Sequence, residues 1–240
     1  YNSKIRELKL NDGFRDFDYG ESPSGLGTFA NNLITNIKIP PLVYRIPRGC
    51  FQDNLIRDIE FGDGLVELGS NSFINNRLTN LTIPNKIEKV GSFAFKSNNI
   101  KTLKISSGMS EINHGVFDFN EIEELTVPGN ISEIGYSAFG NNTPLRKVKL
   151  EEGVELISEY AFEKSVELDH VSIPDSITSI GYRSFHQSGR YVDKTYIYVN
   201  MKGNDRFDED RESYIIRGYE FPLDGTYSRF VIRPLDEFPE

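Results

Sequence analysis

Apolar residues return along this chain with a period of about 22 residues. A phenylalanine marks each period, and successive phenylalanines are 22 or 23 residues apart, at Phe29, Phe51, Phe73, Phe95, Phe117, Phe139, Phe162 and Phe185. A repeat this regular predicts a solenoid, in which similar turns stack on one another and bury a continuous core.

Apolar and polar residues alternate in a short stretch ahead of each phenylalanine. In Leu78–Pro84, for example, Leu81 and Ile83 flank the polar Thr82. Alternation with period two is typical of a strand with one buried face. The central position is apolar in every turn, as Leu8, Ile37, Ile59, Leu81, Leu103, Leu125, Val148 and Val171. Equivalent strands in successive turns run in the same direction, so we expect them to pair in parallel.

A second pair of apolar positions lies between each strand and its phenylalanine. In the turn of Phe95 these positions are Ile87 and Val90. Their spacing suits either a short, bent strand or a single helical turn, and both interpretations remain open. The predicted fold is therefore a solenoid of about eight turns of 22–23 residues, with a parallel β-sheet on one face and short strands or helical turns on the other.

The turns also alternate in their chemistry after the strand. Even turns place a proline directly after it, at Pro40, Pro84, Pro128 and Pro174. Odd turns place a glycine three residues after it, at Gly13, Gly64, Gly108 and Gly153. We infer that the underlying unit is a pair of turns, about 44 residues long, copied several times.

Two further positions are set by the phenylalanine. The residue before it is small or aliphatic in every turn, which makes Cys50 an inert core thiol rather than a nucleophile. The residue three positions after it is an asparagine in six turns and a serine in two, at Asn32, Asn54, Asn76, Asn98, Asn120, Asn142, Ser165 and Ser188. A side-chain amide at a repeated corner is expected to satisfy neighbouring backbone groups.

The pattern breaks at both ends of the chain. About seven extra residues lie within 14–24, and this insertion is predicted to be a capping flap or a contact loop. The solenoid is assigned to residues 1–188, after which the phenylalanine period stops. Three β-rich stretches follow, at 194–201, 214–221 and 227–233. Residues 189–240 are therefore predicted to form a small β-rich C-terminal cap or the start of a further module.

Charge and composition narrow the function classes. The net charge of −9 argues against a phosphate-binding face, so nucleic acid is not an expected partner. No apolar run reaches membrane-spanning length, so direct membrane insertion is not expected either. A single cysteine cannot supply a disulfide framework.

The string L-x-x-L-x-I-P, then I-x-x-I-G-x-x-A-F, then N recurs along residues 5–188, as in Leu78–Asn98 and Ile122–Asn142. It resembles the BspA-type leucine-rich-repeat family of microbial surface proteins. The resemblance implies a leucine-rich-repeat coil that is secreted or displayed on the cell surface. It also implies non-catalytic binding to host or matrix proteins or to other cells. A signal peptide is not present in the given chain.

Candidate chemistry is sparse. His114, His170 and His186 fall at different positions of different turns, so they do not predict a metal site. The acid pairs Glu123–Glu124 and Glu151–Glu152 are not placed across a cleft by the pattern. We therefore expect no catalytic residues, no cofactor and no metal ion.

The sharpest candidate surface is aromatic. Two or three residues before the phenylalanines, successive turns carry Phe93, His114, Tyr136, Tyr160 and Tyr182. Stacked turns would bring these rings into a strip, and aromatic strips favour contacts with proteins or sugars. The hypothesis is an extracellular or cell-surface domain that presents an extended face to a protein or glycan on a host, a matrix or a neighbouring cell. The alternative is a structural spacer whose function lies in other modules, and the oligomeric state is not predicted.

Overall fold

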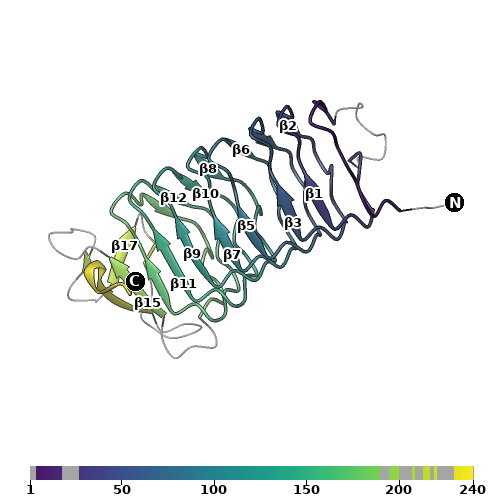
Figure 1. Ribbon diagram of the computed structural model, residues 1–240. Coiled ribbons are helices and arrows are strands. Elements are labelled where there is room, and N and C mark those ends of the chain that lie inside the picture. Colours follow the sequence, from purple (N-terminus) through teal and green to yellow (C-terminus); the bar gives the residue numbers. More distant parts are fainter. Residues whose placement is uncertain are drawn as a thin grey trace. The chain divides into compact units, whose positions relative to one another are not determined.

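The computed structural model describes residues 4–17, 27–189, 195–199, 207–208, 213–216, 219–220 and 230–239. The chain divides into two compact units. Unit 1 comprises Tyr1–Met109 and Asn113–Asn120, and unit 2 comprises Ser110–Ile112 and Glu121–Glu240. Each unit is a coil of stacked turns with a strand on each of two walls (Figure 1).

In unit 1 one wall consists of three-residue strands and the other of two-residue strands. The first wall holds β1 (Asn36–Lys38), β3 (Asp58–Glu60), β5 (Asn80–Thr82) and β7 (Thr102–Lys104). The second wall holds β2 (Arg45–Ile46), β4 (Glu67–Leu68) and β6 (Lys89–Val90). The opposite wall is therefore built from short strands, which settles the choice that the sequence pattern left open.

Strand register in unit 1 follows the predicted alignment of the turns. Ile37 lies opposite Ile59, and Leu81 lies opposite Leu103, in parallel pairs. The ladders join β1 to β3 and β5 to β7 as two separate sheets. Each of these sheets combines one proline turn with one glycine turn, in agreement with a repeating unit of two turns.

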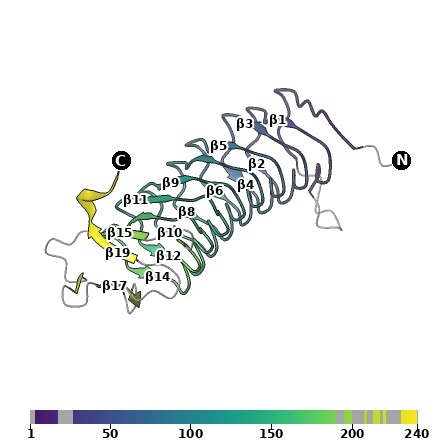
Figure 2. The same ribbon diagram turned by 90° about the horizontal axis from the view of Figure 1, so that it is seen from below.

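Unit 2 has a continuous five-stranded sheet on one wall. It holds β9 (Glu124–Val127), β11 (Lys147–Leu150), β13 (His170–Ser172), β15 (Thr195–Val199) and β19 (Phe230–Pro234), all parallel. The other wall holds β8 (Glu111–Ile112), β10 (Glu133–Ile134), β12 (Leu156–Ile157) and β14 (Ser179–Ile180). Figure 2 shows β15 and β19 side by side in this sheet.

The segment after residue 188 contributes further strands. β15 and β19 lie within or overlap the predicted stretches 194–201 and 227–233. The stretch 214–221 overlaps β17 (Ser213–Ile216) and β18 (Tyr219–Glu220), which pair antiparallel with each other, and β16 (Phe207–Asp208) pairs with β17. A 3-10 helix, η1 (Leu235–Glu237), follows β19 directly. The assignment of 189–240 as a cap stays a prediction.

Seven of the eight predicted strand positions form strands on the sheet wall of the described residues. The first, around Leu8, does not, although Leu33 N–H donates to the Ile5 carbonyl at 2.8 Å. Phe17, in the predicted insertion, is 1% exposed and meets the rings of Phe29 and Phe51 edge-on at 6.1 and 5.5 Å. The insertion therefore covers the aromatic column through Phe17, while its residues 18–24 lie outside the described part.

The repeated phenylalanines form stacked columns inside the units. In unit 1 the ring centroids from Phe29 to Phe117 are 5.3–6.0 Å apart with interplanar angles of 1–15°. In unit 2 Phe139, Phe162 and Phe185 are spaced by 5.5 and 5.2 Å. Since neighbouring strands lie about 4.8 Å apart, these separations correspond to offset stacking, which the quadrupole of each ring favours.

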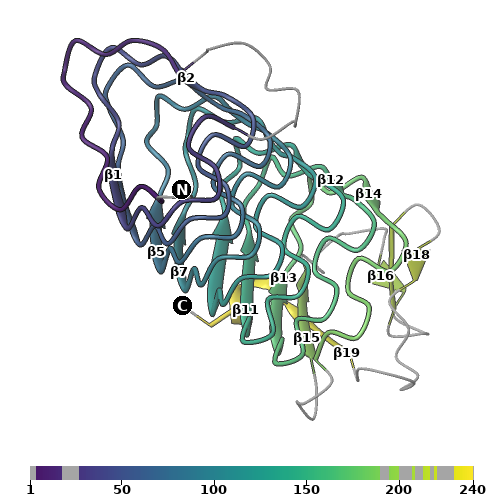
Figure 3. The ribbon, with the colours of Figure 1, turned by 90° about the vertical axis from the view of Figure 1, so that its right-hand side faces the viewer.

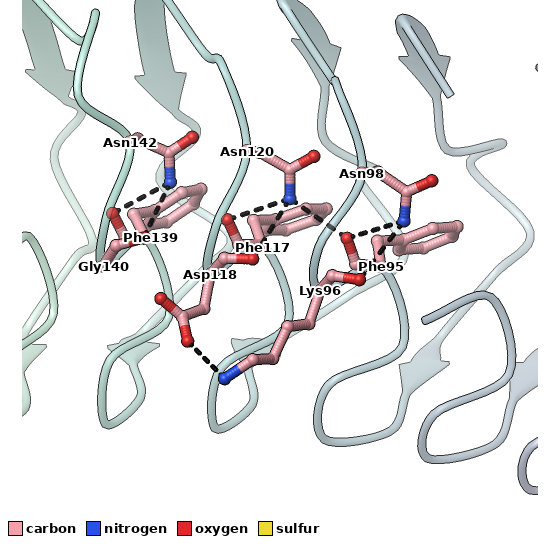
Figure 4. Close-up of polar contacts among 9 residues, drawn as sticks. All are labelled: Phe95, Lys96, Asn98, Phe117, Asp118, Asn120, Phe139, Gly140 and Asn142. Atoms are coloured by element: carbon pink, nitrogen blue, oxygen red, sulfur yellow. Dashed lines mark hydrogen bonds and ion pairs between the residues drawn. The ribbon is translucent and has the colours of Figure 1, made fainter. Parts of the chain in front are cut away.

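The asparagine beside each ring holds the turns together, as predicted. In unit 1 the amide of Asn120 donates to the carbonyls of Phe95 and Phe117 at 3.0 and 3.1 Å (Figure 4). The side-chain oxygen of Asn120 accepts from Ile100 N–H at 3.0 Å. In unit 2 the amide of Asn142 donates to the Phe139 carbonyl at 3.0 Å. Each asparagine thus satisfies buried backbone groups that have no strand partner.

Candidate functional site

The backbone around each phenylalanine has a fixed left-handed geometry. With few exceptions, the residues two before and two after it have φ between +52° and +62°. Most of these positions hold glycine, asparagine, aspartate, serine or other polar residues, but three hold aromatic rings, at Phe93, Phe119 and Tyr160. A bulky residue in this region costs on the order of 1 kcal/mol. The strain therefore singles out these three positions as candidates for a functional role.

In unit 2 three tyrosines from successive turns lie next to one another. The ring of Tyr160 is 5.4 Å from that of Tyr136 and 6.2 Å from that of Tyr182. Tyr136 and Tyr182 are 43% and 58% exposed, and Tyr160 is half-buried between them. The guanidinium of Arg183 lies 5.0 Å from the Tyr182 ring centroid. We call Tyr136, Tyr160 and Tyr182 the tyrosine strip.

The rings of the tyrosine strip do not form a flat platform. Tyr136 and Tyr160 are tilted by 54°, and Tyr160 and Tyr182 are almost perpendicular at 89°. A row of sugar rings stacks best on aromatic faces that share one plane. The tilted arrangement instead offers edges, faces and hydroxyl groups, which suits the irregular surface of a protein.

In unit 1 the remaining two predicted site residues are also neighbours. The rings of Phe93 and His114 are 4.7 Å apart with an interplanar angle of 52°. Phe93 and His114 therefore form one ring contact in unit 1, and the tyrosine strip forms another group in unit 2. The role of all five residues in binding stays a prediction.

Sequence reasoning missed three residues that complete the unit 1 group, Lys96, Asp118 and Phe119. The ammonium of Lys96 lies over the rings of both Phe93 and Phe119, at 5.3 and 5.1 Å, and pairs with the Asp118 carboxylate at 2.7 Å. The Asp118 side chain is 5% exposed, whereas Phe119 is 51% exposed. Phe119 could have been found from the sequence, because it is the one aromatic residue two positions after a repeat phenylalanine.

The other side chains with chemically reactive groups are buried or bonded to neighbouring groups of the fold. Burial raises the pKa of the Cys50 thiol far above its ordinary value, and this disfavours the reactive thiolate. His170 Nδ1 lies 2.6 Å from the carboxylate of Asp169. The Glu152 carboxylate accepts from the backbone N–H groups of Asp175 and Ser176. In the described part of the chain, no group of three or more His, Cys, Asp or Glu side chains is placed to hold a metal ion.

Solved structures and a family model relate the chain to known proteins, whereas curated proteins do not. A search of curated proteins finds no match. Among solved structures, a leucine rich cell surface protein from Faecalibacterium prausnitzii A2-165 is 18% identical, with 65% of this chain and 57% of that chain covered and a TM-score of 0.36. The pneumococcal vaccine antigen PcpA is 17% identical, with coverages of 76% and 65% and a TM-score of 0.34.

A leucine-rich repeat protein from Bacteroides ovatus ATCC 8483 is 14% identical, with 87% of this chain and 80% of that chain covered and a TM-score of 0.33. The chain thus spans less than two thirds of the length of the first two structures. The family model described as BspA type leucine rich repeat region matches residues 25–146 and residues 71–192, which together span 168 of 240 residues. The chain therefore belongs to the BspA-type leucine-rich-repeat family.

Proposed function

We propose that this chain is a non-catalytic binding domain, secreted or displayed at a cell surface, that holds a protein partner through the tyrosine strip of unit 2. The partner would lie on a host, a matrix or a neighbouring cell. The observation that carries the proposal is a ladder of three tyrosines, two of them with large exposed rings, in which Tyr160 keeps an unfavourable left-handed backbone.

The composition of the strip supports a role in recognition. Tyrosine and arginine are enriched among the residues that dominate protein interfaces, because they offer large contact areas and directed polar groups. Tyr182 and Arg183 provide this combination at one exposed end of the strip. Membership of the BspA-type leucine-rich-repeat family, whose repeat pattern is the one that resembles microbial surface proteins, supports the location. No helix among the described residues has the length and apolar character needed to cross a membrane.

The test compares the wild-type chain with the variant Tyr136→Ala/Tyr160→Ala/Tyr182→Ala. Both are measured by surface plasmon resonance against a panel of purified extracellular-matrix proteins and, separately, on a glycan array. Tyr44→Ala is the matched control, since Tyr44 is 60% exposed but lies in unit 1, outside the strip. Circular dichroism checks that each variant keeps the fold.

We expect the wild-type chain and Tyr44→Ala to bind the same matrix protein, and the triple variant to lose at least ten-fold in affinity. Equal binding by the triple variant would remove the strip as the contact. Binding to glycans alone would replace the protein partner by a sugar. An absence of wild-type binding to any protein of the panel would count against the proposal.

A further inference from the structure

The outer face of the sheet in unit 2 becomes progressively covered from β9 to β15. One row across these strands consists of Thr126, Lys149, Ser172 and Tyr198, which lie side by side in register. Thr126 and Lys149 are exposed, whereas Ser172 is 2% and Tyr198 is 6% exposed. Something therefore shields the polar face at its β13–β15 end.

The shield is built from the C-terminal segment and from aromatic rings on the strands. The ring of Phe238 meets that of Tyr198 edge-on at 5.2 Å and 88°. The ammonium of Lys147, on β11, lies 5.2 Å from the Phe238 ring centroid. The segment after β19 thus runs back across β15 towards β11, as the yellow trace in Figure 3 shows.

The residues beneath this segment form an aromatic surface in which the rings stack on one another. The His170 ring stacks on Tyr196 at 5.5 Å and on Tyr198 at 5.7 Å, with interplanar angles of 28° and 12°. The Asp169 carboxylate bonds His170 Nδ1 and fixes the orientation of the imidazole ring. The guanidinium of Arg233 lies over Tyr196 at 5.8 Å.

This arrangement differs from the cap that a solenoid needs. A cap shields the apolar core at the end of the coil, and the core side of these strands carries residues such as Val148 and Val171, which are fully buried. Side chains alternate between the two faces of a strand, so Lys147, His170 and Tyr198 lie on the opposite, outer face. Phe238 therefore lies over the outer face of the sheet, opposite the face that packs on the core.

We propose that the outer face of β11, β13 and β15 is a second docking site, which takes a protein segment carrying an aromatic residue beside carboxylates, and that Leu235–Phe238 occupies it in cis as a built-in competitor. Charge supports this occupant. Lys147 and Lys149 supply cations from β11, and Asp236 and Glu237 place two exposed carboxylates directly before the Phe238 ring. Partner segments with the same pattern would displace the chain's own segment.

The attachment of the segment suits a competitor. Among the side chains of this segment that the structure describes, the half-buried ring of Phe238 makes an edge-on contact with Tyr198 and a contact with the Lys147 ammonium. Because Asp236 and Glu237 remain exposed, their attraction to the lysines of β11 is weak, which favours this segment without holding it tightly. The site does not depend on the tyrosine strip, so it stands or falls separately from the function proposed above.

The test uses a fluorescein-labelled peptide with the sequence of residues 235–240, Leu-Asp-Glu-Phe-Pro-Glu, and fluorescence anisotropy. The receptors are the full wild-type chain and the full chain with Phe238→Ala, in which the competing ring is absent. We expect the peptide to bind Phe238→Ala at least ten-fold more tightly than wild type. A peptide with alanine in place of its phenylalanine should not bind.

Two further variants test the site itself. Adding Lys147→Ala or Tyr198→Ala to Phe238→Ala should abolish peptide binding, whereas adding Tyr44→Ala, at an exposed ring in unit 1, should leave it unchanged. If circular dichroism shows that Phe238→Ala is misfolded, Phe238→Leu serves instead, because it keeps an apolar side chain but loses the ring.

Three results would overturn the proposal. The first is equal peptide affinity for wild type and for the variant with the altered segment. The second is peptide binding that does not require Lys147, Tyr198 or the peptide's own ring. The third is a wild-type dimer in light scattering that becomes a monomer on Phe238→Ala, since the occupant would then be the segment of a second copy.

Discussion

The corner asparagines stabilise the coil through buried hydrogen bonds, and this contribution to stability can be measured at Asn98. Its side-chain oxygen accepts from Leu78 N–H at 3.1 Å, and its amide donates to the carbonyls of Phe73 and Phe95 at 3.0 Å each. Asn98 is 6% exposed, so water cannot replace these bonds easily. We expect Asn98→Ala to destabilise unit 1 by about 3 kcal/mol.

This magnitude comes from counting the groups that lose their partners. The Phe73 carbonyl still accepts from Asn76, and the Phe95 carbonyl still accepts from Asn120. Each of them therefore loses a second hydrogen bond, which is worth about 0.5 kcal/mol. Leu78 N–H loses its bond to Asn98 and is left buried, at a cost of about 2 kcal/mol.

Ser72→Ala is the matched control within the same unit. Its hydroxyl is buried and has no hydrogen-bond partner, and the next turn carries Ala94 at the equivalent position. Removal of an unsatisfied hydroxyl should leave stability unchanged or raise it slightly. Both variants thus delete buried polar atoms from the same coil, but those of Asn98 are hydrogen-bonded and that of Ser72 is not.

Cys50 supplies the assay, because the chain contains no tryptophan and only this cysteine. The thiol is fully buried, and burial raises its pKa, so a thiol reagent such as DTNB should label it only when unit 1 opens. A loss of 3 kcal/mol corresponds to labelling that is about 100-fold faster. The urea midpoint followed by circular dichroism should fall by about 1.5 M. A labelling ratio of Asn98→Ala to Ser72→Ala below about five-fold would refute the accounting.

Asn98→Asp separates the two halves of the interaction. A carboxylate keeps the acceptor for Leu78 N–H but turns a second oxygen towards the Phe73 and Phe95 carbonyls. Burial and these carbonyls should raise the pKa of the new carboxyl in the folded state. The destabilisation should therefore be greatest at neutral pH and shrink as the pH falls towards about 4, where the unfolded chain also binds the proton.

Two further predictions follow from other contacts. Gly153 has φ +109°, and an added Cβ would meet the backbone of Gly129, so Gly153→Ala should destabilise unit 2 by at least about 2 kcal/mol. In the control Gly13→Ala, the added Cβ would meet only a side-chain oxygen at 3.3 Å, and the melting temperature of the chain should change little. Lys96→Met removes the Lys96 ammonium from the buried Asp118 carboxylate and should cost about 2 kcal/mol in urea unfolding. Adding Asp118→Asn should recover part of that loss, and no recovery would show that the pair does not act as a pair.

The sequence predicted the repeat because the determinants of the coil are local and periodic. The central strand position sets the register, and the structure pairs Leu125 with Val148 and Val148 with Val171 as the alignment predicts. The phenylalanine and asparagine columns were visible for the same reason. The nature of the opposite wall was not, since two apolar residues per turn fit a two-residue strand and a helical turn equally well.

The features that the sequence did not reveal depend on contacts that do not recur from one turn to the next. Ser172 and Tyr198 lie on the outer face of the sheet but are buried, near the place where the C-terminal segment returns over the sheet. That return joins Phe238 to Lys147, which are 91 residues apart in sequence. The Lys96 pair with Asp118 was missed because each of the two residues occupies a position that is variable from turn to turn.

The residues that stabilise the coil and the residues proposed to bind a partner occupy different positions of the turn, and this separation makes the binding tests interpretable. The buried phenylalanines and the corner asparagines satisfy the core and the backbone, while Tyr136 and Tyr182 project from a position that holds leucine, arginine, serine, histidine or glutamate in the other turns. Replacing an exposed ring removes little buried area, so it should cost less than about 1 kcal/mol of stability. A loss of binding in the strip variant without a loss of folding would therefore report on the contact surface, whereas a loss of both would place these rings among the determinants of the coil.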